Sequence, residues 1–352
     1  HGGAPEDLPA DLAERQLIAR RLIVERCLYG VDFNHMAVEL AKLSLWLVTL
    51  SRHRPFGYLD HALQTGDSLL GVTDIEQVIH FHLVPEQGKK LHHGMFDMSG
   101  EIRELVREAT ELRREMRTKR VVDITDIRAI ARMDDRSKGI MEKPKVIADL
   151  VVGASLAGGN NPDKLLASRY SRLGHVLDSD SQALADLGAV AQRDLDTDLP
   201  ASLDHRRTFH WVLSYPEVFT DGRSGFDAIV GNPPFKGGQK ISGDLGSAYR
   251  DHLVEQIANG KKGSADLVVY FFLRVAELLT DHGCAGLLAT NTIAEGDTRQ
   301  VGLEEMARKG ITLHAAYPNE PWPGKAAVVT SRIHFTHQNW KGPRSLLGRD
   351  VP

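Results

Sequence analysis

The sequence LYGVDFNHMAVELAKLSLWLVTL, residues 28–50, has the pattern of a β-strand followed by a helix. Its first apolar residues end at Asp32, and Asn34 stands where a helix cap is expected, just before the predicted helix 36–50. Apolar residues lie on almost every side of that helix, so we expect it to be buried between a sheet and other protein. Because a second short strand is predicted at residues 62–65, the stretch indicates a parallel strand–helix–strand unit.

The chain changes character downstream of this unit. Residues 101–119 are rich in Glu and Arg at spacings of three and four, which is typical of a long exposed helix and of one half of a helical hairpin. The glycine-rich residues 153–164 are predicted to form a loop. We interpret residues 72–207 as a mainly helical insertion.

Strands and helices alternate again after the insertion. The predicted strands are 209–213, 226–230, 284–289, 311–317 and 326–335, and the predicted helices are 266–279, with a stop at 281–283, and 300–309. The sequence therefore predicts an α/β fold in which residues 1–71 and 208–352 form one sheet domain that the insertion interrupts.

The amino-acid composition limits the class of protein and the location that the sequence allows. The 352 residues are 42% hydrophobic and 26% charged, as in globular chains, and the net charge of -4 is uninformative about nucleic acid. Two cysteines, Cys27 and Cys284, are too few for a disulfide framework or a four-thiolate zinc site, which favours a reducing, cytoplasmic location. No apolar run is long enough to cross a bilayer and the histidines show no metal-binding pattern, so we expect no membrane segment and no metal.

Two predicted strands end at carboxylates. In an open parallel sheet, ligands bind at the carboxyl ends of the strands. Asp32 has the position from which a carboxylate accepts hydrogen bonds from the hydroxyls of a ribose, and Asp67, in the turn 66–68, has a position suited to the exocyclic amine of an adenine. Either residue is also explained by an ordinary turn or helix cap.

A third strand end, FDAIVGNPPF at residues 226–235, is more specific. Pro233 and Pro234 remove two backbone donors and fix two φ angles, which holds the preceding carbonyl groups rigid and unpaired. Asn232 adds a side-chain carbonyl, and Phe235 offers a flat face on which a base can stack. Such acceptors suit a substrate whose amine group donates hydrogen bonds. Taken alone, the four residues 232–235 would be read as a turn.

The sequence resembles the adenine-N6 DNA methyltransferases of the large single-chain restriction-modification type, the IIG and IIL systems and related phage-defence methylases. The likeness covers most of the chain outside the insertion. It is carried by residues 28–34 and 37–47, the turn 66–70, the signature 232–235, residues 291–293 with 296–299, and residues 321–324.

The resemblance implies a Rossmann-like sheet of the class I methyltransferases that use S-adenosylmethionine, with residues 1–71 and 208–352 as its two parts. By that likeness Asp32 and Phe33 would lie at the ribose of the cofactor, and Asp67 and Ser68 at its adenine amine. It implies double-stranded DNA as the partner, with other restriction or phage-defence subunits as further candidates.

The likeness also implies the catalytic residues. Asn232 and Pro233, with Pro234, would bind the target amine, and Phe235 would stack on a flipped adenine. We expect residues 236–243 to form a mobile loop near DNA. The candidate phosphate contacts are Lys236, Lys240 and Arg299.

The chemistry agrees with these residues. The amino nitrogen of adenine is a poor nucleophile because its lone pair is delocalised into the ring, and acceptors for its two N–H groups favour a more pyramidal nitrogen. Methyl transfer to that nitrogen is then direct. Methylation of cytosine C5 would instead need a nucleophilic cysteine, and Cys27 and Cys284 are both predicted to lie in strands.

One feature of the family is missing. A glycine-rich turn is expected after the first strand of these enzymes, and no such turn precedes Asp32. The nearest match, residues 149–159, would require a permuted order of strands. Since the chain begins at His1, we expect the first strand and its glycine turn to lie upstream, and the domain that recognises a DNA sequence to follow Pro352.

Two other functions remain open at this point. The chain would be an inactive fragment that binds DNA or a partner, if cofactor binding requires the missing turn. Alternatively, it would methylate N5 of a glutamine side chain in a protein, because a primary amide also fits between the acceptors of Asn232 and Pro233.

Overall fold

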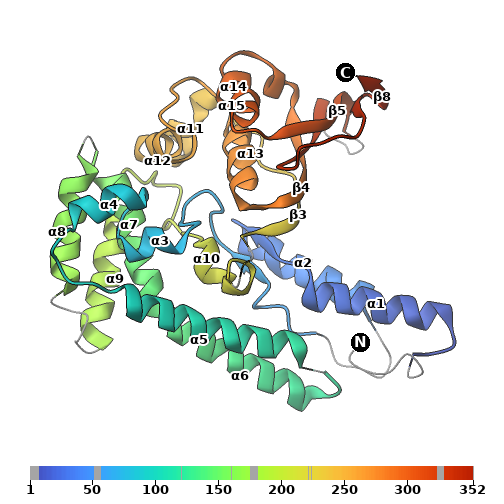
Figure 1. The fold of residues 1–352 in the computed structure, drawn as a ribbon, viewed down its shortest axis with the longest axis horizontal. Helices are drawn as coiled ribbons and strands as arrows, with labels where there is room; N and C mark the ends of the chain where they lie inside the picture. The colour runs from blue at the N-terminus through green and yellow to red at the C-terminus, as the bar shows by residue number, and fades with distance from the viewer. Residues whose placement is uncertain are drawn as a thin grey trace. The chain divides into compact units, whose positions relative to one another are not determined.

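The structure is a computed structural model. It describes residues 8–50, 57–119, 121–159, 161–174, 181–220, 222, 224–322 and 329–351 (Figure 1). The chain divides into two compact units. The first unit comprises residues 1–149, 176–184 and 207–217, and the second comprises residues 150–175, 185–206 and 218–352.

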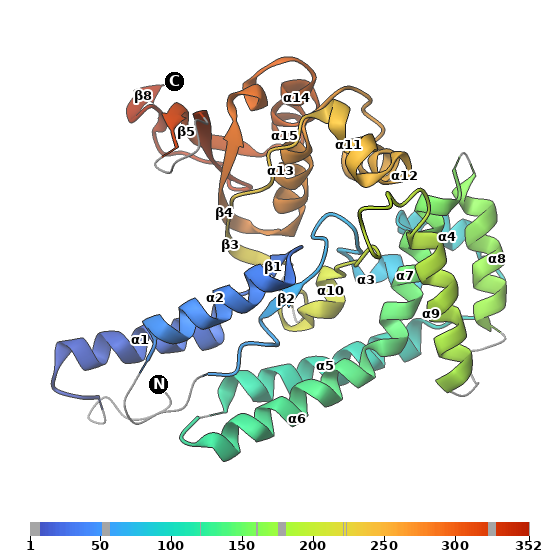
Figure 2. The ribbon, with the colours of Figure 1, turned by 180° about the vertical axis from the view of Figure 1, so that it is seen from behind.

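The predicted strand–helix–strand unit is confirmed in the first unit. Helix α1 (Leu12–Arg26) leads to strand β1 (Gly30–Asp32), helix α2 (His35–Val48) follows, and strand β2 (Leu63–Thr65) pairs with β1 in parallel (Figure 2). Asn34 caps α2 as predicted, because its side chain accepts a hydrogen bond from the Met36 N–H at 2.9 Å. The capping signal therefore located the start of the helix correctly.

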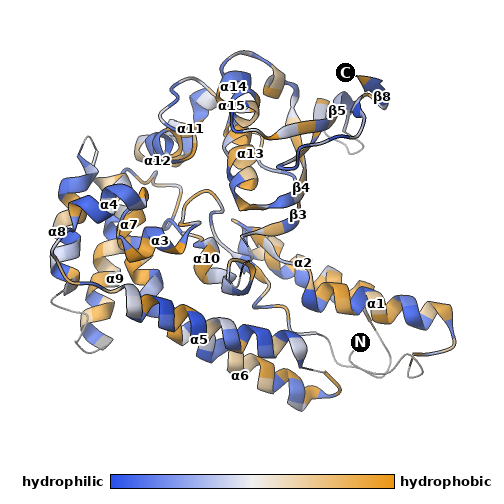
Figure 3. Cartoon of the chain, viewed as in Figure 1, coloured by the Kyte–Doolittle hydropathy of each residue, from blue (hydrophilic) through white to orange (hydrophobic). Residues whose placement is uncertain are grey.

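Helix α2 is buried on one side only. Val38 packs with Val24, Leu59 and Leu63, and the partly buried Leu45 and Trp46 lie against this cluster. Other apolar side chains of α2 are exposed at helical spacing, and Figure 3 shows hydrophobic residues along this helix. They are Met36, Leu40, Leu43 and Leu47. Full burial of α2 was therefore a wrong prediction, since only one face packs against the described residues.

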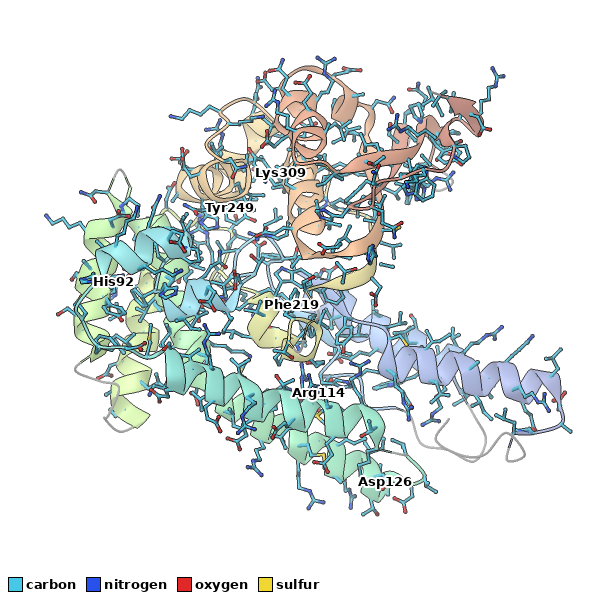
Figure 4. The ribbon with its side chains drawn as sticks, in the orientation of Figure 1. His92, Arg114, Asp126, Phe219, Tyr249 and Lys309 are labelled. Atoms are coloured by element: carbon cyan, nitrogen blue, oxygen red, sulfur yellow. The ribbon has the colours of Figure 1, made fainter. Side chains whose placement is uncertain are left out.

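The described residues between 72 and 207 contain helices and turns but no named strand. The helices are α3 (Ile75–Ile79), α4 (Pro85–Leu91), α5 (Ser99–Thr118), α6 (Ile124–Ile140), α7 (Glu142–Ala157), α8 (Pro162–Gly174) and α9 (Ser181–Leu195). Helices α5 and α6 lie side by side as a hairpin (Figures 1 and 2), which confirms that prediction. Asp126, labelled in Figure 4, forms a capping box with Asp123 at the start of α6. The predicted domain boundaries at residues 71 and 207 stay a prediction.

The predicted loop 153–164 is wrong at both ends, because α7 continues to Ala157 and α8 begins at Pro162. The permuted glycine turn at 149–159 is wrong over almost its whole length, since residues 149–157 belong to α7. Gly153 lies inside this helix. A Cβ atom at Gly153 would come within 2.9 Å of the Asp194 Cβ and 3.1 Å of the Ala191 carbonyl oxygen. The glycine therefore allows α7 and α9 to approach closely, a role that sequence alone does not separate from a loop.

The second unit contains a six-stranded mixed sheet with the order β3-β4-β6-β5-β7-β8. Its strands are β3 (Phe226–Gly231), β4 (Leu279–Thr290), β5 (Thr312–Pro321), β6 (Val329–Thr336), β7 (Arg344–Leu346) and β8 (Arg349–Val351). Strands β3 and β4 are parallel, whereas β6 is antiparallel to both β4 and β5. A mixed α/β fold is confirmed, and the Rossmann-like order of a single sheet stays a prediction.

Helix α13 (Leu267–Leu278) covers this sheet. Its Phe272 stacks on Phe335 of β6 with ring centroids 5.8 Å apart, and both rings are fully buried. The helix follows the predicted amphipathic run. The predicted stop at 281–283 is wrong, because β4 begins at Leu279 directly after the helix.

Two further predictions of secondary structure need correction. The predicted helix 300–309 is divided into two short helices, α14 (Gly296–Val301) and α15 (Leu303–Arg308). Gly302 separates them and packs so closely on Val269 that a Cβ atom at this position would lie 1.8 Å from the Val269 side chain. The predicted strand 209–213 is wrong, because the short helix α10 (Trp211–Ser214) begins within it. The start of the predicted strand 326–335 and residues 323 and 324 of the resemblance lie outside the described residues.

Candidate active site

Asp32 lies at the carboxyl end of β1 and is exposed. One carboxylate oxygen accepts the Asn34 N–H at 2.7 Å, which fixes the turn between β1 and α2. The next residue, Phe33, exposes its ring. The turn therefore presents a carboxylate beside an aromatic face, as a site for a ribose and its base requires.

Asp67 and Ser68 follow β2 and are half-buried. The Asp67 carboxylate accepts the Leu69 N–H at 3.0 Å, while its own N–H donates to the Arg207 carbonyl at 2.8 Å. Because β1 and β2 are parallel and Asp32 is opposite Thr65, the two carboxylates extend from the same edge of this small sheet. The structure thus brings the predicted cofactor residues together, although their roles stay a prediction.

The signature Asn232–Phe235 lies in the second unit, directly after β3. Asn232 and Pro234 are exposed, Pro233 is buried, and Phe235 is 39% exposed. The buried proline ring anchors the segment while the amide of Asn232 stays accessible. Strands β3 and β4 are parallel, with Gly231 opposite Leu287, so their carboxyl ends lie on one edge of the sheet.

Polar residues gather where β4 reaches that edge. The Asn291 amide donates to the Asn319 side-chain oxygen at 2.5 Å, and its own oxygen accepts the Ser331 hydroxyl at 2.8 Å. Asn319 has a φ of +61°, a left-handed conformation that asparagine tolerates. Asn291 belongs to the residues that carried the resemblance, and its two hydrogen bonds tie β4 to β5 and β6.

Asp266 is a residue that sequence reasoning missed. It precedes α13, but its carboxylate accepts hydrogen bonds from the Gly238 N–H at 3.1 Å and from the Thr292 hydroxyl at 2.5 Å. The Leu267 N–H also donates to the Lys236 carbonyl at 2.8 Å. These bonds connect the segment after the signature with the end of β4. In the sequence, Asp266 reads only as a helix cap.

The predicted mobile loop 236–243 is wrong from Gly238 onward, because helix α11 (Gly238–Leu245) begins there. A Cβ at Gly238 would meet the Ser264 carbonyl oxygen at 2.4 Å, so the glycine packs tightly on the backbone before α13. Helix α12 (Ser247–His252) follows. This close packing fixes the segment, and glycine-rich sequence alone predicts the opposite.

The three predicted DNA-binding residues differ in their surroundings. Lys236 forms an ion pair with Asp244 at 2.5 Å, and its hydrogen bond and charge lower the pKa of that carboxyl. Arg299 pairs with Glu304 at 3.1 Å, and Lys240 is exposed on α11. Contact with DNA by these residues stays a prediction.

The described residues lack two features, a metal-binding cluster and a membrane-spanning helix. They contain no group of three or more His, Cys, Asp or Glu side chains that could hold a metal ion. In the same part of the chain, no helix combines the length and the apolar character that crossing a membrane requires.

Comparison with known proteins gives a family match. A model of the Eco57I restriction-modification methylase family matches residues 26–311. No curated protein is significantly similar in sequence to this chain.

Solved structures show distant similarity. The type IIL restriction-modification enzyme MmeI, in complex with DNA, is 13% identical with a TM-score of 0.32 over 85% of this chain and 40% of that chain. The type IIG restriction endonuclease BpuSI is 14% identical with a TM-score of 0.28 over 78% and 38%. A type I restriction-modification methyltransferase subunit from Streptococcus thermophilus is 12% identical with a TM-score of 0.26 over 77% and 67%. The chain therefore spans 40% of MmeI and 38% of BpuSI.

Proposed function

Because the chain belongs to the Eco57I restriction-modification methylase family, we propose that it is the catalytic part of a DNA methyltransferase that methylates adenine at N6. The resemblance found in the sequence is confirmed at the level of the family. The observation that carries the finer proposal is the signature Asn232–Phe235 at the carboxyl end of β3, beside the end of the parallel strand β4.

S-adenosylmethionine is the cofactor that we propose, and the residues present fit it. Its chemical contribution is an activated methyl group. Asp32 is an exposed acceptor for ribose hydroxyls, and Asp67 is an acceptor for an amine at the same edge of the sheet. The exposed ring of Phe33 lies next to Asp32 and offers an apolar face for the adenine. Ser68 follows Asp67 in the turn after β2.

A further strand beside β3 is part of this proposal. Strand β3 is the outermost strand on its side of the six-stranded sheet. Its sequence is that of a buried strand, yet Val230 is 86% exposed. An apolar edge of this kind is normally paired or covered. This supports the proposal that a further strand pairs with the edge of β3.

At the target base, Asn232 and Pro233 would act as acceptors for the two N–H groups of the adenine amine. The exposed amide oxygen of Asn232 and the rigid carbonyl of Pro233 would orient the nitrogen toward the methyl carbon. Such alignment contributes up to about 7–11 kcal/mol of rate acceleration in favourable cases. Pro234 keeps the segment rigid, and the partly exposed ring of Phe235 is available for stacking on a flipped base.

Two observations favour direct transfer to an amine over methylation of cytosine C5. The latter chemistry needs a cysteine thiolate next to the base. Cys27 follows α1 before β1 begins, and Cys284 lies within β4, opposite Ala228 of β3. Neither thiol belongs to the turns at the carboxyl ends of the strands.

Double-stranded DNA is the proposed substrate, in restriction-modification or phage defence, and other subunits of such systems are proposed partners. The test uses the native polypeptide that contains this chain, cofactor with a tritiated methyl group, and duplex DNA. Digestion of the DNA to nucleosides should place the label in N6-methyldeoxyadenosine. Label in another nucleoside, or in a glutamine of an added protein extract and not in DNA, would contradict the proposal.

A further inference from the structure

Residues 207–217, here called the brace segment, contact the turn that carries Asp67 and the starts of both strands of the proposed cofactor site. The indole N–H of Trp211 donates to the Ser68 carbonyl at 3.0 Å, next to Asp67. The hydroxyl of Tyr215 lies 2.8 Å from the carbonyl oxygens of both Gly30 and Ala62, at the start of β1 and just before β2. All these residues belong to the first unit.

Backbone hydrogen bonds add to these side-chain contacts. The Arg207 carbonyl accepts the N–H of Asp67 at 2.8 Å, and the Phe209 N–H donates to the Leu70 carbonyl at 2.8 Å. The Trp211 N–H continues the series with a 2.9 Å bond to the Val72 carbonyl. The brace segment therefore runs along the turn that carries Asp67 and Ser68.

The small sheet needs such support. Strands β1 and β2 have three residues each and form a two-stranded sheet of their own. Two isolated strands are at best marginally stable in water. Their own pairing is therefore insufficient to hold Asp32 and Asp67 in fixed positions, and contacts from outside the pair must contribute.

Tyr215 is well placed to provide them. Its side chain is fully buried, and its ring packs against Tyr29 and Phe209 with centroid distances of 4.8 and 5.4 Å. Burial raises the pKa of the Tyr215 hydroxyl, so it stays protonated and donates its one hydrogen to one of the two carbonyl oxygens at a time. In a buried setting such hydrogen bonds are stronger than in water.

The end of the brace segment is fixed as well. The fully buried carboxylate of Glu217 accepts the Tyr29 hydroxyl at 3.0 Å and lies 3.5 Å from the Arg113 guanidinium. Tyr29 immediately precedes β1. The segment is thus held at its far end to the same strand that leads to Asp32.

We propose that Trp211 and Tyr215 are positioning residues of the cofactor site. Trp211 holds the turn of Asp67 through the Ser68 carbonyl, and Tyr215 holds the starts of β1 and β2, the strands that lead to Asp32 and Asp67, through the carbonyl groups of Gly30 and Ala62. The proposal rests on the proposed function. Neither side chain is assigned a contact with the cofactor. Their removal should weaken cofactor binding and leave the rate at saturating cofactor nearly unchanged, since the target-base residues lie elsewhere in the chain.

The experiment removes one hydrogen-bond donor at a time from the native polypeptide. Tyr215→Phe removes only the hydroxyl, and Trp211→Phe removes the indole N–H. Titration calorimetry with S-adenosylmethionine should show a dissociation constant raised about fivefold for each variant, as expected for the loss of one buried hydrogen bond. Amide hydrogen exchange should rise at residues 30–32 and 65–69.

The first unit offers matched controls. Tyr58→Phe removes a hydroxyl that donates to Asp134 at 2.8 Å, and Trp46→Phe removes an indole N–H that donates to the Gly57 carbonyl at 2.8 Å. Neither contact involves the turns of Asp32 or Asp67. Both controls should bind the cofactor as the wild type does.

The outcomes separate this proposal from the proposed function. Normal cofactor binding by Tyr215→Phe and Trp211→Phe, or equal weakening in the two controls, would overturn the positioning role. If Asp32→Ala nevertheless loses affinity, the cofactor site itself stands. If Asp32→Ala and Asp67→Ala also bind S-adenosylmethionine as the wild type does, both the proposed cofactor site and the positioning role are wrong.

Discussion

Asp32 illustrates how one side chain can serve both a turn and a ligand. Its carboxylate accepts the Asn34 N–H at 2.7 Å, which alone would explain its place in the sequence. Asp97 makes the same type of bond, to the Ser99 N–H at 2.8 Å, in the same unit. A comparison of variants at Asp32 and Asp97 therefore separates the structural role of such a carboxylate from the proposed contact with ribose hydroxyls.

Asp32→Ala in the native polypeptide should weaken S-adenosylmethionine about tenfold or more, because a charge-assisted hydrogen bond contributes about 1.5–3 kcal/mol. Asp97→Ala should leave the affinity unchanged. Calorimetry measures both. Equal affinities for Asp32→Ala and the wild type would return Asp32 to the role of a turn residue.

Asn232 is exposed at the end of β3, so its amide oxygen is open to a substrate. Asn232→Ala should lower the single-turnover rate of methyl transfer by more than about tenfold, since one lost hydrogen bond to a transition state commonly costs about 2.7–4 kcal/mol. Cofactor affinity should stay the same. Asn339→Ala, at another exposed asparagine of the second unit, is the control. A parental rate for Asn232→Ala would show that the signature has another role.

At the scale of elements, sequence predicted best where a cap or a strict pattern sets the boundary. Asn34 and the apolar run after it located α2, and the run 226–230 located β3 with its signature. The candidate carboxylates and Asn232 followed from those strand ends. The prediction failed at Gly153 and Gly302, where glycines serve close packing between elements that are distant in sequence.

The brace segment shows a second reason for failure. Its alternating apolar residues 209–213 were read as a strand, yet the bonds that use Trp211 and Tyr215 go to segments about 150 residues earlier. Local pattern carries no information on such partners. The same applies to Asp266, whose carboxylate binds segments on both sides of it in the sequence.

The hairpin α5–α6 contains two arginines with very different surroundings. Arg107 is exposed, as the charged pattern predicted, and it pairs with Glu104 and Glu111. Arg113 is buried instead, and it binds Asp134 at 3.0 Å as well as the Ser214 carbonyl at 2.5 Å. Its guanidinium also lies 3.5 Å from the buried carboxylate of Glu217.

Arg113→Leu should therefore lower the free energy of unfolding by about 3–5 kcal/mol, because it leaves the buried carboxylate of Glu217 without the cation beside it and takes from the buried Asp134 one of its two cations, the other being Lys138. Arg107→Leu should change it by no more than about 1 kcal/mol. Urea unfolding followed by circular dichroism compares the two variants. A similar small change in both would mean that Arg113 does not connect the hairpin to the rest of the first unit.

At the scale of the whole molecule, each unit contains a buried histidine that stays neutral when folded. Burial, with the charge of Arg113, lowers the pKa of His61 to about 4 in the first unit. In the second unit, burial and the charges of Arg274 and Arg206 lower the pKa of His252 to about 3. Both side chains would titrate near 6.5 in the unfolded chain.

Stability should consequently fall as the pH is lowered from 7 to 5, because over this range the unfolded chain binds protons that the folded chain does not. At pH 5 each histidine contributes a loss of about 2 kcal/mol. His252→Gln should reduce this dependence, whereas His93→Gln, at an exposed position, should not. Urea unfolding at several pH values measures the effect, and a constant or rising stability would contradict it.

The central claim is that Asn232 and its neighbours direct a methyl group to the amine of adenine in DNA. The most direct test expresses the native polypeptide, and separately its Asn232→Ala variant, in a host without adenine methylation, and analyses the genomic nucleosides by mass spectrometry. The account predicts N6-methyldeoxyadenosine with the wild type and its near absence with Asn232→Ala at equal protein levels. No N6-methyldeoxyadenosine with the wild type, or equal amounts with both, would contradict it.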